Sequence, residues 1–134
     1  MPNINTHAFR LKPGADLKKS ILAFVREKKL TAAWISTCVG SLTSYQLRFA
    51  NQQKGSKDTG HFEIVSLAGT LSVNGSHLHM SVSDGSGKTI GGHLMDDCFI
   101  YTTAEIVIQS SDEFIFTREK DGTTDWEELQ VGKK

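Results

Sequence analysis

The chain has 134 residues, which is the usual size of a single domain, so we expect residues 1–134 to fold around one hydrophobic core. Its 15 Lys and Arg residues balance its 15 Asp and Glu residues, and this neutral charge gives no electrostatic reason to expect a nucleic acid, an anionic membrane or an acidic substrate as partner. No stretch reaches the roughly 20 apolar residues that span a bilayer, and the first residues lack a secretory signal pattern, so we expect a cytoplasmic protein.

The first elements along the chain are a short strand and a helix. Residues 7–11 have the composition of a strand, and Pro13 and Gly14 then turn the chain. Asp16 is placed to cap a helix over residues 17–29. Helical spacing puts one set of side chains on a common face that should lie on a sheet: Leu17, Ile21, Phe24 and Val25, extended by the stem of Lys28.

The middle of the chain predicts three strands. Residues 31–39 are apolar and β-branched, Gly40 and Ser41 are expected to break or bend this run, and residues 42–50 form the next strand. The polar residues 51–60 are predicted to be a loop. Residues 61–71 alternate loosely and predict a further strand.

A hairpin is predicted next, because Asn74-Gly75 lies between two strand-like runs. Residues 77–83 alternate cleanly, and a second turn at residues 84–87 leads to a strand within residues 88–94. Residues 99–109 and 113–119 supply two last strands. The polar tail at residues 121–134 is expected to be loosely held, apart from Trp126 and Leu129.

Many strands with short turns and one convincing helix predict an α+β domain: a mostly antiparallel sheet with one main helix packed on it. Leu78, Met80 and Val82 need one apolar cover. A second apolar row suggests that the other face of the sheet is apolar too. Because one helix can cover only one face, partner subunits are a reasonable cover for the other face. That row is Ile100, Thr102, Ala104, Ile106 and Ile108.

Three of the five histidines lie close together in the sequence. His77 and His79 share a strand face, and His93 reaches the same patch if residues 88–94 pair with residues 77–83. Three imidazoles suit zinc or another divalent transition metal, with nickel and iron also accepted, and they leave a coordination position open for water or a ligand. The alternative is exposed or hydrogen-bonded histidines with no ion.

Catalysis at such a centre would need a carboxylate nearby, and Glu63 is the candidate catalytic residue. Asp84 and Glu105 are the other available carboxylates, although a turn residue and a solvent-facing residue are their simpler interpretations. Residues 85–89 (GSGKT) resemble the end of a P-loop, but the first glycine of that motif is replaced by Val82. No sequence motif specifies a reaction, so catalytic activity stays open.

The two cysteines, Cys38 and Cys98, are far apart in sequence, and neither belongs to a CxxC pattern. They are expected to be reduced thiols and mostly buried.

Several segments in the same order resemble the plants-and-prokaryotes-conserved (PPC) domain, over residues 6–118. They are residues 10–17 (RLKPGADL), 39–50 (VGSLTSYQLRFA), 61–72 (HFEIVSLAGTLS), 77–94 (HLHMSVSDGSGKTIGGHL) and 101–108 (YTTAEIVI). The resemblance implies an α+β fold, a homotrimer and, as in some free-standing members, a zinc-like metal on the HxH and GGH histidines, which here are His77, His79 and His93.

Plant relatives carry AT-hooks, and their PPC domain mediates self-association, partner binding and nuclear placement. Residues 1–134 contain no AT-hook, although a trimer could gather Arg10, Lys12, Lys18 and Lys19 into a basic patch. The plant partner-binding segment reads Gly-Arg-Phe-Glu-Ile-Leu, whereas residues 60–65 here have His61 in the place of Arg. His61 could join the metal site, support it or face solvent.

Three functions follow from these observations. The first is a homotrimer whose histidine metal site binds a small molecule or anion, with hydrolysis as one activity open to it. The alternative is a DNA-associated regulatory protein, and the second alternative is a protein-interaction module. The sequence does not identify the ligand.

Overall fold

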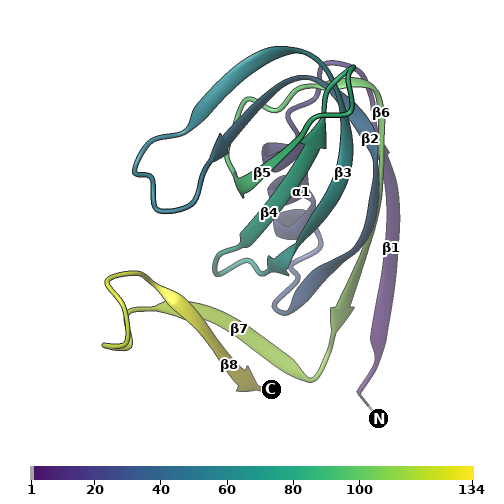
Figure 1. Ribbon diagram of the computed structural model, residues 1–134. Helices are drawn as coiled ribbons and strands as arrows, with labels where there is room; N and C mark the ends of the chain where they lie inside the picture. Colours follow the sequence, from purple (N-terminus) through teal and green to yellow (C-terminus); the bar gives the residue numbers. More distant parts are fainter. Residues whose placement is uncertain (1) are drawn as a thin grey trace.

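A computed structural model describes residues 2–134 (Figure 1). Six strands form the main sheet in the order β1-β6-β2-β3-β4-β5, and every strand pairing is antiparallel. This confirms the predicted α+β class. The main-sheet strands are β1 (Ile4–Leu11), β2 (Ala33–Arg48), β3 (Ser56–Leu71), β4 (His77–Ser83), β5 (Thr89–Leu94) and β6 (Ile100–Ser111); the single helix α1 spans Leu17–Glu27, and β7 (Phe114–Glu119) pairs with β8 (Glu128–Lys133).

Strand β2 is one long strand, so of the two alternatives at Gly40 and Ser41 the bend is present and the break is not. The glycine serves a close approach between strands, because a Cβ built on Gly40 would lie 2.3 Å from the carbonyl oxygen of Thr103 in β6. The register of β2 against β6 shifts between Gly40 and Leu42, which bends the strand without ending it.

The sheet curls until its far strand meets β2 again. The last residues of β2 pair with β5, with Leu47 opposite Leu94 and Arg48 opposite His93. In Figure 1 the helix lies behind β4 and β5, inside this curl. The closure matters for the site because it places the end of β5 between β4 and β2.

Strand β3 begins at Ser56, inside the segment predicted to be a loop at residues 51–60. The polar residues Lys57, Asp58 and Thr59 continue the ladder with β2, where Ser56 lies opposite Leu47. Their side chains are largely exposed, so the polar composition did not reveal the strand.

Helix α1 begins where the sequence predicts. The side chain of Asp16 accepts a hydrogen bond from the backbone N–H of Lys19, which caps the first turn. Leu17, Ile21 and Val25 are buried in the core. Phe24 is partly buried and stacks on Phe9 of β1, with ring centroids 4.5 Å apart.

The apolar row of β6 is covered within the subunit, which corrects the expectation that it needs a partner. Ile100, Ala104, Ile106 and Ile108 belong to the same core as Leu78, Met80 and Val82 of β4, while Thr102 is exposed. The curled sheet folds both rows onto one core. Other large apolar side chains are exposed instead: Ile4, Val39, Val65, Val73, Phe99, Tyr101, Trp126 and Val131.

The C-terminal segment forms an ordered hairpin of β7 and β8, contrary to the predicted loose tail. Phe114 lies opposite Lys133, and Glu119 lies opposite Glu128. The hairpin is held to the main fold by hydrogen bonds on Phe116, whose N–H donates to the carbonyl oxygen of Thr31 at 2.8 Å. The side chains of Ser72 and Asn74 donate to the Phe116 carbonyl oxygen.

Trp126 is 66% exposed, so the prediction that it anchors the tail is wrong, whereas Leu129 is half-buried.

The described chain, residues 2–134, includes no helix of the length and apolar character required to cross a bilayer.

Candidate metal centre

The three predicted histidines lie on two adjacent strands near the end of the β3–β4 hairpin. The Asn74-Gly75 turn leads into β4, whose alternation puts His77 and His79 on the face opposite the buried Leu78 and Met80. His79 lies directly opposite His93 in the β4–β5 ladder. The proposed strand pairing is therefore present.

The ring nitrogens converge. One nitrogen from each of His77, His79 and His93 can be chosen so that all lie within 4.8 Å of one another. The Nε2 atoms of His77 and His79 are 3.1 Å apart. Two nitrogens bound to one tetrahedral zinc, each at about 2.0–2.1 Å, would lie roughly 3.3 Å apart, so this pair fits a common metal.

The electrostatics of the cluster favour neutral imidazoles, which are the metal-binding form. Burial and the nearby Arg48 guanidinium lower the pKa of His93 to about 4. Burial also lowers the pKa of His77, with smaller contributions from His79 and Arg118. The Nδ1 atom of His93 is buried and has no hydrogen-bond partner among the described residues, so the protein alone leaves one ring nitrogen unsatisfied.

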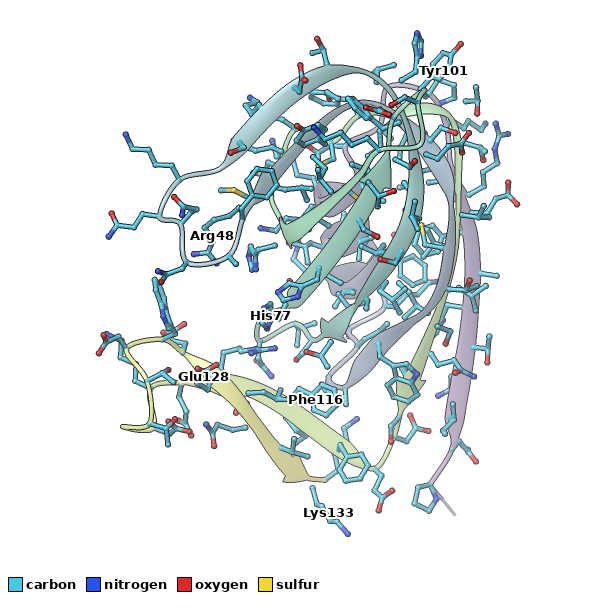
Figure 2. All side chains as sticks on the ribbon, viewed as in Figure 1. Arg48, His77, Tyr101, Phe116, Glu128 and Lys133 are labelled. Carbon is cyan, nitrogen blue, oxygen red and sulfur yellow. The ribbon has the colours of Figure 1, made fainter. Side chains whose placement is uncertain are left out.

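A pocket of about 390 Å³ opens beside His77 and His79. Its other walls come from β3, through Ala68, Gly69 and Thr70, and from the C-terminal hairpin, through Arg118, Glu128 and Leu129. Figure 2 shows Glu128 on the hairpin and His77 on the neighbouring end of the sheet. Sequence reasoning missed Arg118 and Glu128, because their polar segment carries no motif and reaches the site only through the tertiary arrangement.

Glu63 lies away from the cluster. It is exposed and pairs with Ser83 at the opposite end of β4 from His77, and it does not line the pocket. Glu128 is the carboxylate that the fold brings to the pocket.

The other carboxylates follow their simpler interpretations. Asp84 accepts hydrogen bonds from the backbone N–H groups of Ser86 and Lys88, which stabilises the β4–β5 turn and lowers its pKa, with the Ser86 hydroxyl contributing most. Glu105 is exposed on β6.

His61 does not join the cluster. Its ring lies 5.1 Å from that of Tyr101, and Figure 2 shows Tyr101 far from His77. Of the three alternatives for His61, the exposed side chain is the one present, and the two roles at the metal centre are not supported.

Both cysteines are free thiols. Cys98 is buried and Cys38 is half-buried, and burial raises the pKa of each thiol to about 11. At neutral pH both are protonated, so neither is an activated nucleophile.

Comparison with known protein families shows which family the chain belongs to. Residues 1–112 match the Plants and Prokaryotes Conserved (PCC) domain, the same family as PPC. The chain belongs to this family. Its histidine cluster lies inside the matched segment, and the β7–β8 hairpin lies beyond it.

Two relatives carry the domain within longer chains. The bifunctional protein GlmU of Synechococcus sp. (strain JA-3-3Ab) is 41% identical over 98% of this chain, which corresponds to 21% of that protein. The AT-hook motif nuclear-localized protein 13 of Arabidopsis thaliana is 32% identical over 64% of this chain and 22% of that protein. The PPC chain thus spans about a fifth of the length of these relatives.

Two solved structures share the whole architecture. A hypothetical protein from Salmonella cholerae-suis is 40% identical, with a TM-score of 0.97, covering 100% of this chain and 97% of that one. A metal-containing protein from Archaeoglobus fulgidus is 25% identical, with a TM-score of 0.79, covering 94% of this chain and 93% of that one.

Proposed function

We propose that this PPC protein is a homotrimer that holds a divalent transition metal, zinc first, on His77, His79 and His93 and presents an open coordination position to a small molecule or anion. The observation that carries the proposal is the convergence of three ring nitrogens within 4.8 Å of one another. The buried, unpartnered Nδ1 of His93 and the metal-containing relative from Archaeoglobus fulgidus support it.

The chemistry of the donor set agrees with such a metal. Three neutral imidazoles form a common zinc ligand set that leaves one position open, and a metal held there would act as a Lewis acid toward an oxygen ligand. Arg118 and Glu128 line the adjoining pocket, so charged groups of both signs face whatever enters. Glu128, unlike Glu63, is placed to act on a bound molecule as a proton acceptor or hydrogen-bond acceptor.

Elemental analysis of protein purified without chelators tests the metal. We expect about one equivalent of a transition metal per subunit and its loss when His77, His79 and His93 are all replaced by Ala. His61→Ala is the matched control, since His61 lies against Tyr101 outside the cluster, and it should keep the metal. A metal-free wild-type protein, or a triple variant that retains the metal, would contradict the proposal.

The homotrimer is supported by exposed apolar side chains on the main sheet. Val39 of β2 is 57% exposed and Val65 of β3 is 56% exposed, and such residues suit an interface between copies. Light scattering should give three times the subunit mass of 14.7 kDa. A monomer would contradict this part of the proposal.

DNA association is the second candidate, favoured by the 32% identical Arabidopsis relative, which is named for an AT-hook. Charge argues against strong binding, because the chain is formally neutral. A trimer would need to gather cations such as Lys12, Lys18 and Lys19. Retardation of duplex DNA that weakens with salt would support this candidate, and no retardation at low ionic strength would remove it.

A protein-interaction module is the third candidate. It is supported by the two longer relatives, in which the domain makes up about a fifth of the chain. In that case the histidine metal would act as a structural staple, and removing the histidines would lower stability without changing small-molecule binding.

A further inference from the structure

Arg118 lies beside the histidine cluster although it comes from the C-terminal hairpin, beyond residues 1–112 that match the family. Its Nη2 donates a hydrogen bond to Thr70 Oγ1 of β3 at 2.9 Å, and its side chain lines the pocket with His77 and His79. The guanidinium is therefore fixed at the site by a contact between the hairpin and the sheet.

The β3–β4 turn leaves room for this side chain. A Cβ built on Gly75 would lie 2.8 Å from Cγ of Arg118, and Gly75 has a φ of +135°. A side chain at this position would push the Arg118 stem away from the pocket. Gly75 thus serves both the turn that starts β4 and the placement of Arg118.

Arg118 forms no salt bridge within the described residues, although Glu128 lines the same pocket. Across residues 2–134 the salt bridges are Lys57–Asp97 and Lys133–Glu113, and neither includes Arg118. Its Nε is buried and has no hydrogen-bond partner within residues 2–134. A partly buried guanidinium with one neutral acceptor and no direct ion pair has hydrogen-bond donors to spare, so an acceptor from outside the chain would complete it.

The remaining walls limit what that acceptor can be. Ala68 and Leu129 give the pocket apolar surface, and Glu128 adds a negative charge to the same pocket. An apolar body would pack against the first two residues, whereas a dianion would be repelled by the third. Among anions, a singly charged one with an apolar part suits these walls best, because Glu128 opposes each further negative charge on the ligand.

We propose that Arg118 makes this pocket a binding site for a small monocarboxylate with an apolar body, held next to the three histidines. This inference rests on the proposed function, since it names the class of molecule that the open position of the histidine site receives. The carboxylate takes its counter-charge from Arg118, and its apolar part contacts Ala68 and Leu129.

Calorimetric titration of the metal-loaded protein with benzoate and with its neutral analogue benzamide tests the proposal. We expect benzoate to bind about tenfold more tightly than benzamide, because a hydrogen bond to a charged group is worth about this factor or more. Arg118→Gln should weaken benzoate binding about tenfold and benzamide binding by less, with metal content unchanged. Arg10→Gln is the matched control, because Arg10 bonds Thr102 and Thr103 outside the pocket, and it should change neither affinity.

A second variant keeps the test independent of any folding defect in Arg118→Gln. Glu128→Gln removes the negative charge from the same pocket and should strengthen benzoate binding about 3-fold. An unchanged or weaker affinity would contradict the charge argument. Equal benzoate affinity in wild type and a folded Arg118→Gln would overturn the proposal directly.

Titration with inorganic phosphate distinguishes a phosphate-binding site from a carboxylate-binding site. Tighter binding of phosphate than of benzoate, with the same dependence on Arg118, would overturn the assignment to a carboxylate. Failure of the metal proposal is separable, because a metal-free wild type contradicts that proposal by elemental analysis alone. Arg118-dependent benzoate binding by such a protein would still support the anion site.

Discussion

The main sheet and the C-terminal hairpin differ in how they are held and in what they supply. Strand β6 alone buries Ile100, Ala104, Ile106 and Ile108, whereas no residue from 112 to 134 is buried. The sheet therefore provides the hydrophobic stabilisation and the histidines. The hairpin is tethered through its backbone at Phe116 and provides Arg118 and Glu128 to the pocket. A weakly buried element thus supplies two charged walls of the pocket beside histidines that the buried sheet positions.

The largest contrast should appear when an apolar side chain is shortened in each region. Ile106 is 1% exposed, so Ile106→Ala should lower the free energy of unfolding by about 3 kcal/mol through lost burial and a cavity. Val131 on β8 is 59% exposed, so Val131→Ala should change it by less than about 0.5 kcal/mol. Urea denaturation at one fixed protein concentration measures both. Equal losses would show that the hairpin shares the core's stabilising role.

A smaller contrast separates two glycines with positive φ. A Cβ on Gly69 in β3 would lie 2.0 Å from the carbonyl oxygen of His77, whereas a Cβ on Gly122 in the hairpin turn would meet no described atom within 4 Å. We expect Gly69→Ala to cost about 2–3 kcal/mol and to displace His77, since backbone must move. Gly122→Ala should cost about 1 kcal/mol, from the left-handed backbone alone. Thermal unfolding with metal analysis compares them, and retained metal in Gly69→Ala would argue against a rigid strand pair.

The smallest contrast concerns two aspartates that each accept several hydrogen bonds. Asp16 caps α1 and also accepts from the N–H of Asp97 at 2.8 Å, so Asp16→Ala should cost about 1–2 kcal/mol. Asp121 accepts from Thr123 and Gln130 in the exposed hairpin turn, and Asp121→Ala should leave the urea midpoint unchanged. A clear loss from Asp121→Ala would mean that the hairpin turn is a structural element in its own right.

The local patterns of the chain were sufficient for the elements that depend on neighbours in sequence. Strict alternation predicted β4 at its observed bounds, and the aspartate before an amphipathic run predicted the start of α1. The His77 and His79 pair follows from strand periodicity, and the Asn74-Gly75 turn was found from its two residues. These features are set by φ/ψ preferences and side-chain direction, which a short window of sequence contains.

Only the tertiary structure decided the features that join distant segments. Gly40 looked like a break, but it permits close packing of β2 on β6, and the polar start of β3 became a strand because β2 offered it a ladder. The apolar row of β6 turned inward because the sheet curls. Arg118 and Glu128 reached the histidines through backbone hydrogen bonds of the hairpin to the sheet, which no local pattern encodes. Burial and long-range pairing depend on the whole chain, so the sequence alone determined the histidine pair and the fold class, while the tertiary structure determined the pocket around it.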